Sequence, residues 1–369
     1  MYPLFLHNYA AQQGLPMNVT RIRLDRIASA TRNIDLAREV TIGSDLVVRQ
    51  GYVLAVRILN DKYVYNTMEH VTGRMIPLHS GDIMAGVLGS RRALRGYAGV
   101  VPEQLSVGET INILNLGGVL GHCTGTNPEL GPPFEAEVLG AILSFPPIGD
   151  RVGVPAHIGE GVIEKENEIG VTPPVVYVAG TSMNSGKTMA ATEITRFLVK
   201  KGLKIAACKM TGVSLRRDTL CMLDAGAVQG VDFTDLGKAT THNEDVLPVA
   251  RGLLNHLSKA APDLIVAELG DGILGEYGVE AILSDPQLMK LACCHVVCAS
   301  DPVAIFGADQ IYRQNFGLNI NVVAGPVTDN SVGRDYIDKA LGLAAYNARY
   351  DIEGLGNIIL KHFENQRAL

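Results

Sequence analysis

The stretch VVYVAGTSMNSGKTMAATEITRFLVKKG, residues 175–202, decides the fold of this chain. It joins a continuous apolar run, a glycine-containing loop and a helical pattern that stops before Gly202, a residue suited to a helix C-cap. The loop GTSMNSGKT (180–188) presents backbone N–H groups at a helix start, where they and the helix dipole attract an anion. The sequence therefore predicts a phosphate-binding loop on an α/β sheet.

The spacing of this loop is unusual, because five residues rather than four separate Gly180 from Gly186. We expect Lys187 to reach the β- and γ-phosphates of a nucleotide and Thr188 to offer its hydroxyl to Mg²⁺. The alternative is a glycine turn without a ligand. The residues predicted to bind the cofactor are Gly180, Thr181, Ser182, Met183, Asn184, Ser185, Gly186, Lys187 and Thr188.

Composition limits the class of protein. The chain has 369 residues, of which 47% are apolar and 19% charged, and this predicts a globular protein of about two domains. The formal net charge of −6 and the lack of a basic stripe predict no nucleic-acid partner. No apolar run reaches the roughly 18–20 residues of a membrane span, and the six cysteines lie mostly in apolar segments. We therefore expect a soluble, cytoplasmic protein with no membrane partner.

The texture of the chain changes near residue 170. Residues 1–170 show short period-two apolar runs broken by Gly and Asp, which predicts a β-rich, barrel-like or sandwich-like domain that ends in a Pro- and Gly-rich connection. Residues 171–369 alternate strand and helix patterns, with further buried strands expected at 263–269, 295–300 and 320–327 and one or two closing helices after 334. This half is predicted to be a doubly wound, mainly parallel α/β domain.

The lengthened motif G-T-x-x-x-x-G-K-T resembles that of dethiobiotin synthetase and its relatives among the P-loop proteins. In that family the second strand ends in a lysine shortly before a glycine, and LKIAACKMTGV (203–213) matches with Lys209 and Gly212. The resemblance implies that Lys209 faces the transferred phosphate or the acceptor. The alternative is a surface lysine whose stem lies on apolar residues.

The same family has an apolar strand that ends in an acidic residue followed by glycines, which APDLIVAELGDG (261–272) matches with Glu268. The resemblance implies that Glu268 completes the Mg²⁺ shell, because Mg²⁺ prefers oxygen ligands. Asp271 either shares this task, orients the acceptor or is a turn residue. The family's glycine-rich VEGAGG-type sequence is replaced here by AELGDG.

The segment SLRRDTLCMLDAGA (214–227) resembles the molybdopterin-guanine dinucleotide biosynthesis protein B group. That resemblance makes Asp218 a candidate for a second Mg²⁺ contact or a base, and Arg216 or Arg217 a holder of an anionic substrate. The alternative is that these charges decorate a helix start. The predicted catalytic residues are Lys187, Lys209, Glu268 and Asp218, and the predicted metal ligands are Thr188, Glu268 and Asp218.

The nucleotide base is predicted to be adenine, because a guanine-reading N-K-x-D motif is absent from the sequence. The segment GPVTDN (325–330) occupies the place where relatives often contact the base, which makes Asn330 the candidate for that role. No lysine directly follows Gly180, and this argues against the nucleotide-sandwich dimer of the partition and arsenical-pump ATPases.

Three other clusters of polar residues are candidates for sites: one on a cysteine-rich strand, one at His122 and Cys123, and one of three arginines. Alternation along a strand separates Cys293 and His295 from Cys294 and Cys298, so LACCHVVCAS (291–300) predicts buried thiols rather than a metal site. The adjacent His122 and Cys123 would diverge on an extended chain. Arg91, Arg92 and Arg95 either clasp an acidic ligand at a domain interface or form a solvated face.

The sequence as a whole predicts an enzyme that uses ATP and Mg²⁺ to act on a small anionic acceptor, either a kinase or an ATP-dependent ligase. Catalysis would consist mostly of positioning and charge neutralisation. The alternatives are a nucleotide-dependent switch or chaperone that delivers a metal or cofactor to a partner protein, and a module that only senses nucleotide. A homodimer is expected, as is usual for such folds.

Overall fold

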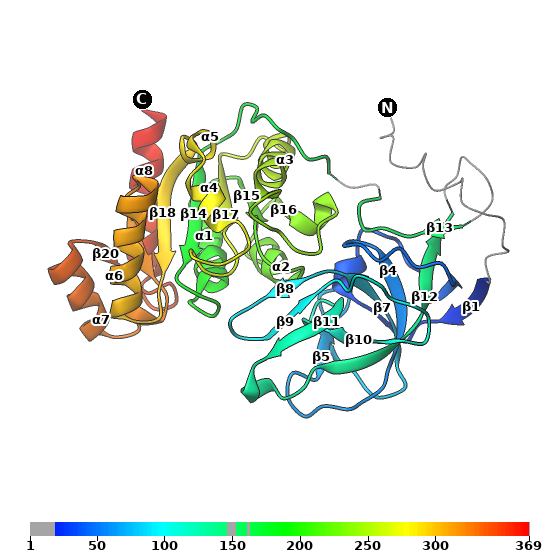
Figure 1. Cartoon of the computed structure of the whole chain (residues 1–369). Coiled ribbons are helices and arrows are strands. Elements are labelled where there is room, and N and C mark those ends of the chain that lie inside the picture. Colours follow the sequence, from blue (N-terminus) through cyan, green and yellow to red (C-terminus); the bar gives the residue numbers. More distant parts are fainter. Residues whose placement is uncertain (1–18, 146–152, 161–162, 369) are drawn as a thin grey trace.

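The computed structural model describes residues 19–145, 153–160 and 163–368. Two sheets organise this part of the chain, a mainly antiparallel sheet built before residue 156 and a parallel sheet built after residue 174 (Figure 1). We call the parts around them the barrel region (residues 19–160) and the P-loop region (residues 175–368). The predicted boundary near residue 170 falls between them and stays a prediction.

The barrel region carries short strands with polar turns between them. Its strands are β1 Val19–Arg23, β2 Arg26–Ile27, β3 Glu39–Gly43, β4 Val53–Ile58, β5 Thr67–Glu69, β6 Met75–Pro77, β7 Ile83–Leu88, β8 Arg91–Arg92, β9 Tyr97–Val100, β10 Thr110–Ile113, β11 Val119–Thr126, β12 Phe134–Ser144 and β13 Val154–Pro155.

Five of these strands close into a small barrel. β12 pairs with β4, β4 with β7, β7 with β11, β11 with β10, and β10 returns to β12. Side chains alternate along each strand, so Leu54, Val56 and Ile58 of β4 point into one core cluster while Val53 and Ala55 join a second. The prediction of a β-rich, barrel-like region is confirmed.

The P-loop region is built on a parallel sheet whose strand order is β16-β15-β17-β14-β18-β19-β20. Its strands are β14 Val175–Gly180, β15 Ile205–Lys209, β16 Gln229–Asp232, β17 Leu264–Glu268, β18 Ala292–Cys298, β19 Val322–Ala324 and β20 Ala344–Ala345. Its helices are α1 Lys187–Lys200, α2 Arg217–Asp224, α3 Val246–Ser258, α4 Val279–Leu283, α5 Pro286–Met289, α6 Pro302–Ile311, α7 Ser331–Tyr336 and α8 Ile352–Arg367.

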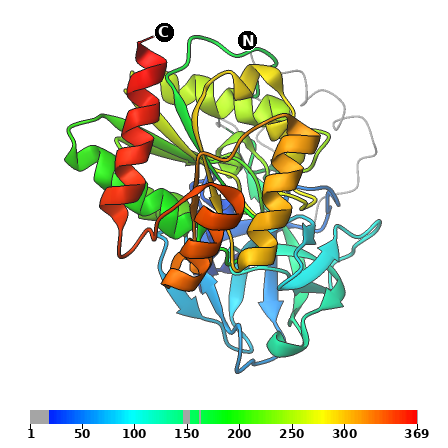
Figure 2. The ribbon, with the colours of Figure 1, turned by 90° about the vertical axis from the view of Figure 1, so that its left-hand side faces the viewer.

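Helices cover both faces of this sheet (Figure 2). Val176 and Val178 of β14 pack with α1 and α8 on one face, whereas Val175 and Tyr177 pack with α3, α4 and α6 on the other. A strand buried on both faces has no polar positions, which explains the continuous apolar run VVYVA. The predicted doubly wound architecture is therefore present.

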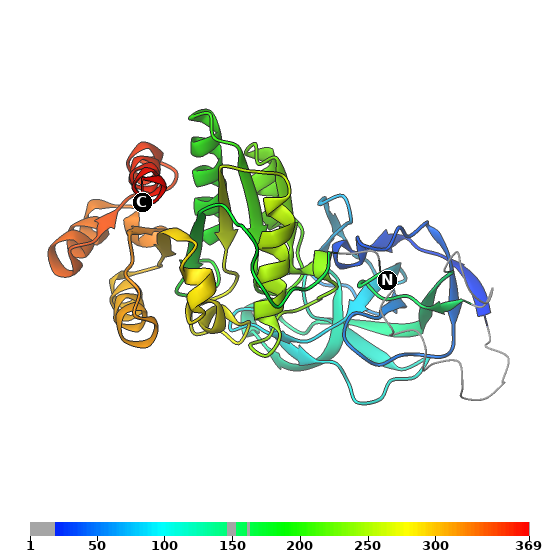
Figure 3. The ribbon, with the colours of Figure 1, turned by 90° about the horizontal axis from the view of Figure 1, so that it is seen from above.

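The barrel region lies beside the P-loop region (Figure 3). Its contacts with Asp232 and Ser214 place it at the carboxyl ends of strands β15 and β16. Asn115 donates from its side-chain amide to the carbonyl of Ser214 at 2.7 Å, and Gln50 donates to the carbonyl of Thr240 at 2.8 Å. Ala239, from the P-loop region, packs in the second core cluster of the barrel region, with Val53 and Ala55 of β4. Because ligands of open α/β sheets bind at the carboxyl edge, the barrel region lies next to the predicted site.

Among the described helices, none has both the length and the apolar character that a membrane span needs.

Candidate functional site

The predicted phosphate loop connects β14 to α1. Thr181 donates its N–H to the carbonyl of Cys298 at 2.9 Å, and Ile273 donates its own to the carbonyl of Gly180 at 2.9 Å, which ties the loop to the end of β18 and to the segment that follows β17. Asn184 and Gly186 have φ angles of +62° and +94°. The loop therefore turns back on itself and starts α1 at Lys187, as the sequence predicts.

Several glycines let other segments approach this loop. A Cβ on Gly272 would lie 2.9 Å from the carbonyl oxygen of Thr181, and one on Gly180 would collide with the hydroxyl of Ser185. A Cβ on Gly186 would lie 3.2 Å from Cα of Gly325. The segments after β17 and β19 therefore rest directly against the loop.

Lys187 is buried and lies across its own loop. Its ammonium donates to the carbonyl of Ser182 at 2.8 Å and reaches the hydroxyl of Ser185 at 3.5 Å. Burial lowers the pKa of Lys187, although Glu268 opposes that shift. A cation held against the loop backbone in this way is placed to meet an anion bound by the loop amides.

Four polar side chains meet at the carboxyl ends of β15 and β17, and we call them the carboxylate cluster: Thr188, Lys209, Asp218 and Glu268. Lys209 and Glu268 are brought together because they pair in register across β15 and β17. The hydroxyl of Thr188 donates to Oε1 of Glu268 at 2.9 Å and reaches Oδ1 of Asp218 at 3.4 Å. Lys209 and Asp218 form a buried ion pair. The four residues predicted from separate motifs are thus neighbours.

Burial governs the charges of the cluster. It raises the pKa of Glu268 to about 7, as does the neighbouring Asp218, while Lys209 and Lys187 oppose the shift. Burial alone would raise the pKa of Asp218, but the ammonium of Lys209 lowers it below its usual value. The pKa of Lys209 is raised by Asp218 and Glu268 against the effect of its own burial. Asp218 and Lys209 therefore favour each other's charged forms, whereas burial favours the neutral form of Glu268.

The cluster suits a divalent cation. Oε2 of Glu268 is buried and has no hydrogen-bond partner within residues 19–145, 153–160 and 163–368. A buried carboxylate oxygen without a partner costs free energy, and a cation would satisfy it. The hydroxyl of Thr188 and the carboxylates of Glu268 and Asp218 supply only oxygen atoms, which Mg²⁺ prefers. These three residues therefore fit Mg²⁺, and the observation that supports the fit is the buried Oε2 of Glu268 without a hydrogen-bond partner in the described chain.

Lys209 is more constrained than the sequence suggests. Only 7% of the residue is exposed, and a Cβ on Gly270 would lie 2.9 Å from its Cε. Gly270, the first glycine of AELGDG, thus makes room for the side chain of Lys209. Its ammonium contacts Asp218, so the alternative interpretation of Lys209 as a surface lysine is wrong.

Asp271 follows the cluster with a φ angle of +69°, a left-handed conformation that is rare for a side chain with a Cβ. Burial raises the pKa of its carboxyl group, and Lys187, Arg91 and Lys209 are near enough to oppose this shift. A strained carboxylate among cations beside the loop is a candidate for contact with an acceptor.

Asn330 is not directed toward a base by any contact of the described chain. Its side-chain oxygen accepts from the N–H groups of Val332 at 3.0 Å and Gly333 at 3.4 Å, which caps α7. The segment that precedes it does reach the loop through Gly325. Its role in base recognition stays a prediction.

The three arginines of the β8–β9 hairpin do not converge. Arg91 is buried and donates to the carbonyl of Leu114 and to the hydroxyl of Tyr65. Arg92 pairs with Glu276, and Arg95 is exposed. The interpretation of these arginines as one clasp for a ligand stays a prediction, and the side chain of Arg91 is already hydrogen-bonded within the barrel region.

The cysteine-rich strand β18 departs from simple alternation. Cys293, Cys294 and Cys298 pack in one core cluster, and the pairing of β18 with β14 shifts register beside Cys293. His295 packs instead against Tyr177 and Tyr312. The prediction that Cys293 shares a face with His295 is wrong, because the bulge turns Cys293 to the other side.

One partner of the site has no signal in the sequence. Glu69 lies in β5 of the barrel region and accepts hydrogen bonds from the N–H groups of Arg216 at 2.6 Å and Arg217 at 2.7 Å. Arg216 and Arg217 open α2, which carries Asp218. The two segments are 147 positions apart, and a contact over that distance leaves no local pattern.

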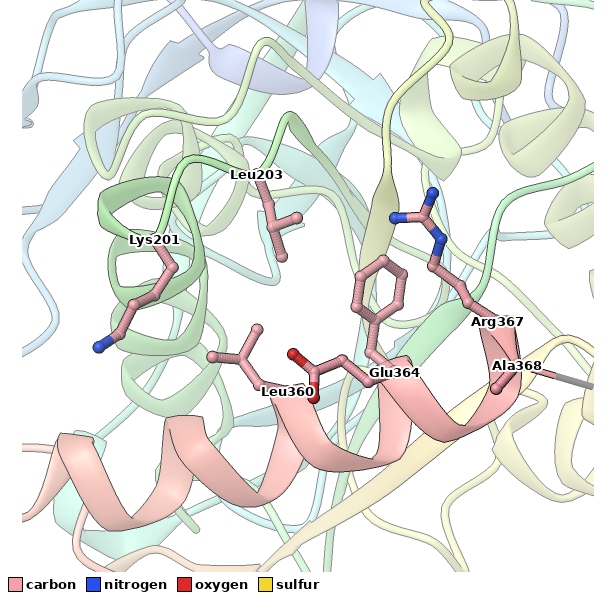
Figure 4. Close-up of a pocket in the computed structure, with 7 residues that line it drawn as sticks. Lys201, Leu203, Leu360, Glu364, Arg367 and Ala368 are labelled. Atoms are coloured by element: carbon pink, nitrogen blue, oxygen red, sulfur yellow. The ribbon is translucent and has the colours of Figure 1, made fainter.

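A separate surface groove lies at the other end of α1 from the loop (Figure 4). It is lined by Lys201, Leu203, Leu360, Phe363, Glu364, Arg367 and Ala368. None of the predicted site residues lines it.

No protein-family model matches the chain, and no curated protein sequence does so either. Solved structures match about half of it. The signal recognition particle receptor FtsY from Elizabethkingia anophelis is 12% identical over 54% of this chain and 68% of that one, with a TM-score of 0.36.

Two other structures match in the same way. A DUF1611 family protein from Anabaena variabilis is 13% identical over 54% of this chain and 63% of that one, with a TM-score of 0.36. The signal recognition particle 54 kDa protein from Aeropyrum pernix in complex with GDP is 16% identical over 57% of this chain and 53% of that one, with a TM-score of 0.33. Likenesses this loose carry no argument about function. The strand, loop and helix of residues 175–200 and the polar groups beside them, by their own geometry, form a P-loop fold. Phosphate binding by the loop stays a prediction.

Proposed function

We propose that this protein is an enzyme that binds a nucleoside triphosphate with Mg²⁺ and uses the γ-phosphate on a small anionic acceptor, as a kinase or an ATP-dependent ligase similar to dethiobiotin synthetase. The observation that carries the proposal is the contact of the Thr188 hydroxyl with Glu268, whose other oxygen is buried without a partner in the described chain. Thr188 lies in the first turn of α1, where the phosphates would bind, and Glu268 reaches it from the end of β17.

Each group has a defined task in this proposal. The amides of residues 180–188 and the ammonium of Lys187 would hold the phosphates, and Thr188, Glu268 and Asp218 would hold Mg²⁺, which neutralises phosphate charge. An acceptor oxygen would attack the γ-phosphorus as the bond to the β,γ-bridging oxygen breaks, leaving the nucleoside diphosphate. Lys209 would neutralise the transferring group, and Asp271 would accept the proton of an acceptor that carries one.

The barrel region is proposed to complete the acceptor site. Loops that follow β15, β16 and β17 contact it through Ser214, Thr240 and Tyr277. The same contacts favour the alternative function, a nucleotide-dependent switch or chaperone whose loops report the nucleotide to the barrel region. The enzyme predicts a modified small molecule, whereas the switch predicts slow hydrolysis that a partner protein stimulates. We further propose ATP as the nucleotide and a homodimer as the assembly.

The first test measures the affinity of the full chain for ATP and for GTP by titration calorimetry with and without Mg²⁺. We expect Lys187→Ala to weaken binding of the Mg²⁺–nucleotide at least tenfold, because it removes the cation nearest the loop. Lys200→Ala, at the exposed end of the same helix, serves as the matched control and should bind like the wild type. Failure of the folded wild type to bind either nucleotide would overturn the proposal.

A further inference from the structure

The β5–β6 hairpin of the barrel region holds the start of α2. Glu69 is fully buried, and its carboxylate accepts hydrogen bonds from the hydroxyl of Ser29 and from the N–H groups of Arg216 and Arg217. The hairpin makes two more contacts with this segment. Arg216 donates to the carbonyl of Val71, and a Cβ on Gly73 would collide with Leu220.

This carboxylate acts as the N-terminal cap of α2. The first N–H groups of a helix have no partner inside the helix, and Arg216, at the N-cap position, supplies no side-chain acceptor. Glu69 satisfies two of these groups and places a negative charge at the positive end of the helix. Hydrogen bonds to a charged acceptor are roughly twice as strong as neutral ones. The position of the first turn of α2 is therefore fixed from the barrel region.

The capped turn carries Asp218 directly into the carboxylate cluster. Asp218 is the second residue of α2, and it contacts both Lys209 and the hydroxyl of Thr188. A shift of the helix start would move its carboxylate away from both. The chain of contacts from Glu69 through the start of α2 to Asp218 joins the barrel region to the proposed metal site.

We propose that Glu69 is a positioning residue that sets Asp218 for binding of the Mg²⁺–nucleotide, so that docking of the β5–β6 hairpin and occupation of the site favour each other. The inference rests on the proposed function. Reciprocity follows from thermodynamic linkage, because a ligand that needs Asp218 in place also stabilises the contacts that place it.

The test compares full-length Glu69→Gln with the wild type. Glutamine keeps the size of the side chain but loses the charge and one acceptor oxygen. Glu109→Gln is the matched control, because Glu109 is an exposed carboxylate of the barrel region that caps a local turn by accepting from the N–H of Ser106 at 2.9 Å. Calorimetry gives the Kd of the nucleotide with and without Mg²⁺ for each protein, and hydrogen exchange follows the amides of residues 217–224 without ligand.

If Glu69 is a positioning residue, Glu69→Gln should lower the ratio of the Kd without Mg²⁺ to the Kd with Mg²⁺ about tenfold. The Kd without Mg²⁺ should stay within twofold of the wild-type value, and the amides of α2 should exchange faster. Glu109→Gln should change none of these. If Glu69 only stabilises the fold, Glu69→Gln should change the Kd values with and without Mg²⁺ by the same factor or leave both unchanged. Either result would overturn the inference. A wild type that binds no nucleotide would instead overturn the proposed function.

Ser29→Ala keeps the test decisive if Glu69→Gln does not fold. It removes one hydrogen bond to Glu69 but leaves both contacts with α2. The inference then requires a smaller loss, about threefold, confined to the Mg²⁺-dependent part of the affinity. An equal loss with and without Mg²⁺ would contradict it.

Discussion

Asp271 has a backbone conformation that its side chain does not favour. An ordinary residue with a Cβ loses about 1–2 kcal/mol in the left-handed region, and glycine adopts it freely. The chain nevertheless has Asp at this position, between Gly270 and Gly272 and beside the loop. We therefore expect the carboxylate of Asp271 to have a use other than stabilising the fold.

Replacement of Asp271 by Gly should therefore raise the free energy of unfolding by up to about 1 kcal/mol while it lowers turnover with the acceptor at least tenfold. Ala261→Gly is the control, because Ala261 is exposed, has a φ angle of +46° and precedes β17 at the far end of the strand from the loop. That variant should gain stability and keep its activity. Chemical denaturation and product formation measure the two effects, and full activity in the Asp271 variant would exclude a catalytic role.

At the scale of elements, a strand or a site residue could be predicted from the sequence where neighbouring residues determine it, and could not where a contact between distant segments does. Strands β14, β15, β17, β18 and β19 are mostly apolar, because a sheet covered on both faces has few polar positions. The exceptions are Lys209 and Glu268, at the carboxyl ends of β15 and β17, and the buried His295 of β18. β16 has the sequence QGVD and β20 only two alanines, so neither carries this signal. The loop residues and Glu268 follow from motifs, whereas Glu69 acts through a contact that no motif encodes. The lining of an acceptor site could not be predicted, because it depends on how two remote segments dock.

Strand β18 carries a histidine whose environment makes stability depend on pH. His295 is buried between Tyr177 and Tyr312, and burial lowers its pKa to about 4 from the ordinary value of 6.5. The unfolded chain binds a proton at this site below pH 6.5, whereas the folded chain does not until pH is near 4. The contribution to stability is thus present above pH 6.5 and is lost as pH falls toward 4.

Between pH 6.5 and pH 4 the free energy of unfolding of the wild type should fall by on the order of 3 kcal/mol more than that of His295→Phe, which has no imidazole to protonate. The aromatic contacts with both tyrosines are retained by phenylalanine. His79→Gln, at an exposed position in the barrel region, is the control and should keep the wild-type dependence. Denaturation at pH 7 and pH 4 measures the difference. Equal losses in the wild type and in the His295 variant would show that the pKa of His295 is the same in the folded and the unfolded chain.

At the scale of the whole molecule, buried polar contacts join the barrel region to the P-loop region. Arg32 donates to Asp232 at 2.6 Å and to Asp235 at 3.0 Å, and its side chain is only 9% exposed. Asn33 donates to the carbonyl of Thr234 in the same turn. Asp232 ends β16, so this ion pair binds the barrel region to an edge of the parallel sheet. We therefore expect the two regions to unfold together, because separating them would break these buried contacts.

Arg32→Ala should therefore destabilise the chain by about 3–5 kcal/mol, because it leaves the carboxylate of Asp232, 1% exposed, without its partner. Removal of Asp232 as well should recover part of this loss, which a double-mutant cycle measures. Arg57→Ala breaks an exposed ion pair with Glu137 inside the barrel region and should cost less than about 1 kcal/mol. Denaturant unfolding followed by two probes, one in each region, should show one transition in the wild type and two in Arg32→Ala. Coincident transitions in that variant would mean that other contacts, those of Glu69 among them, are sufficient to couple the regions.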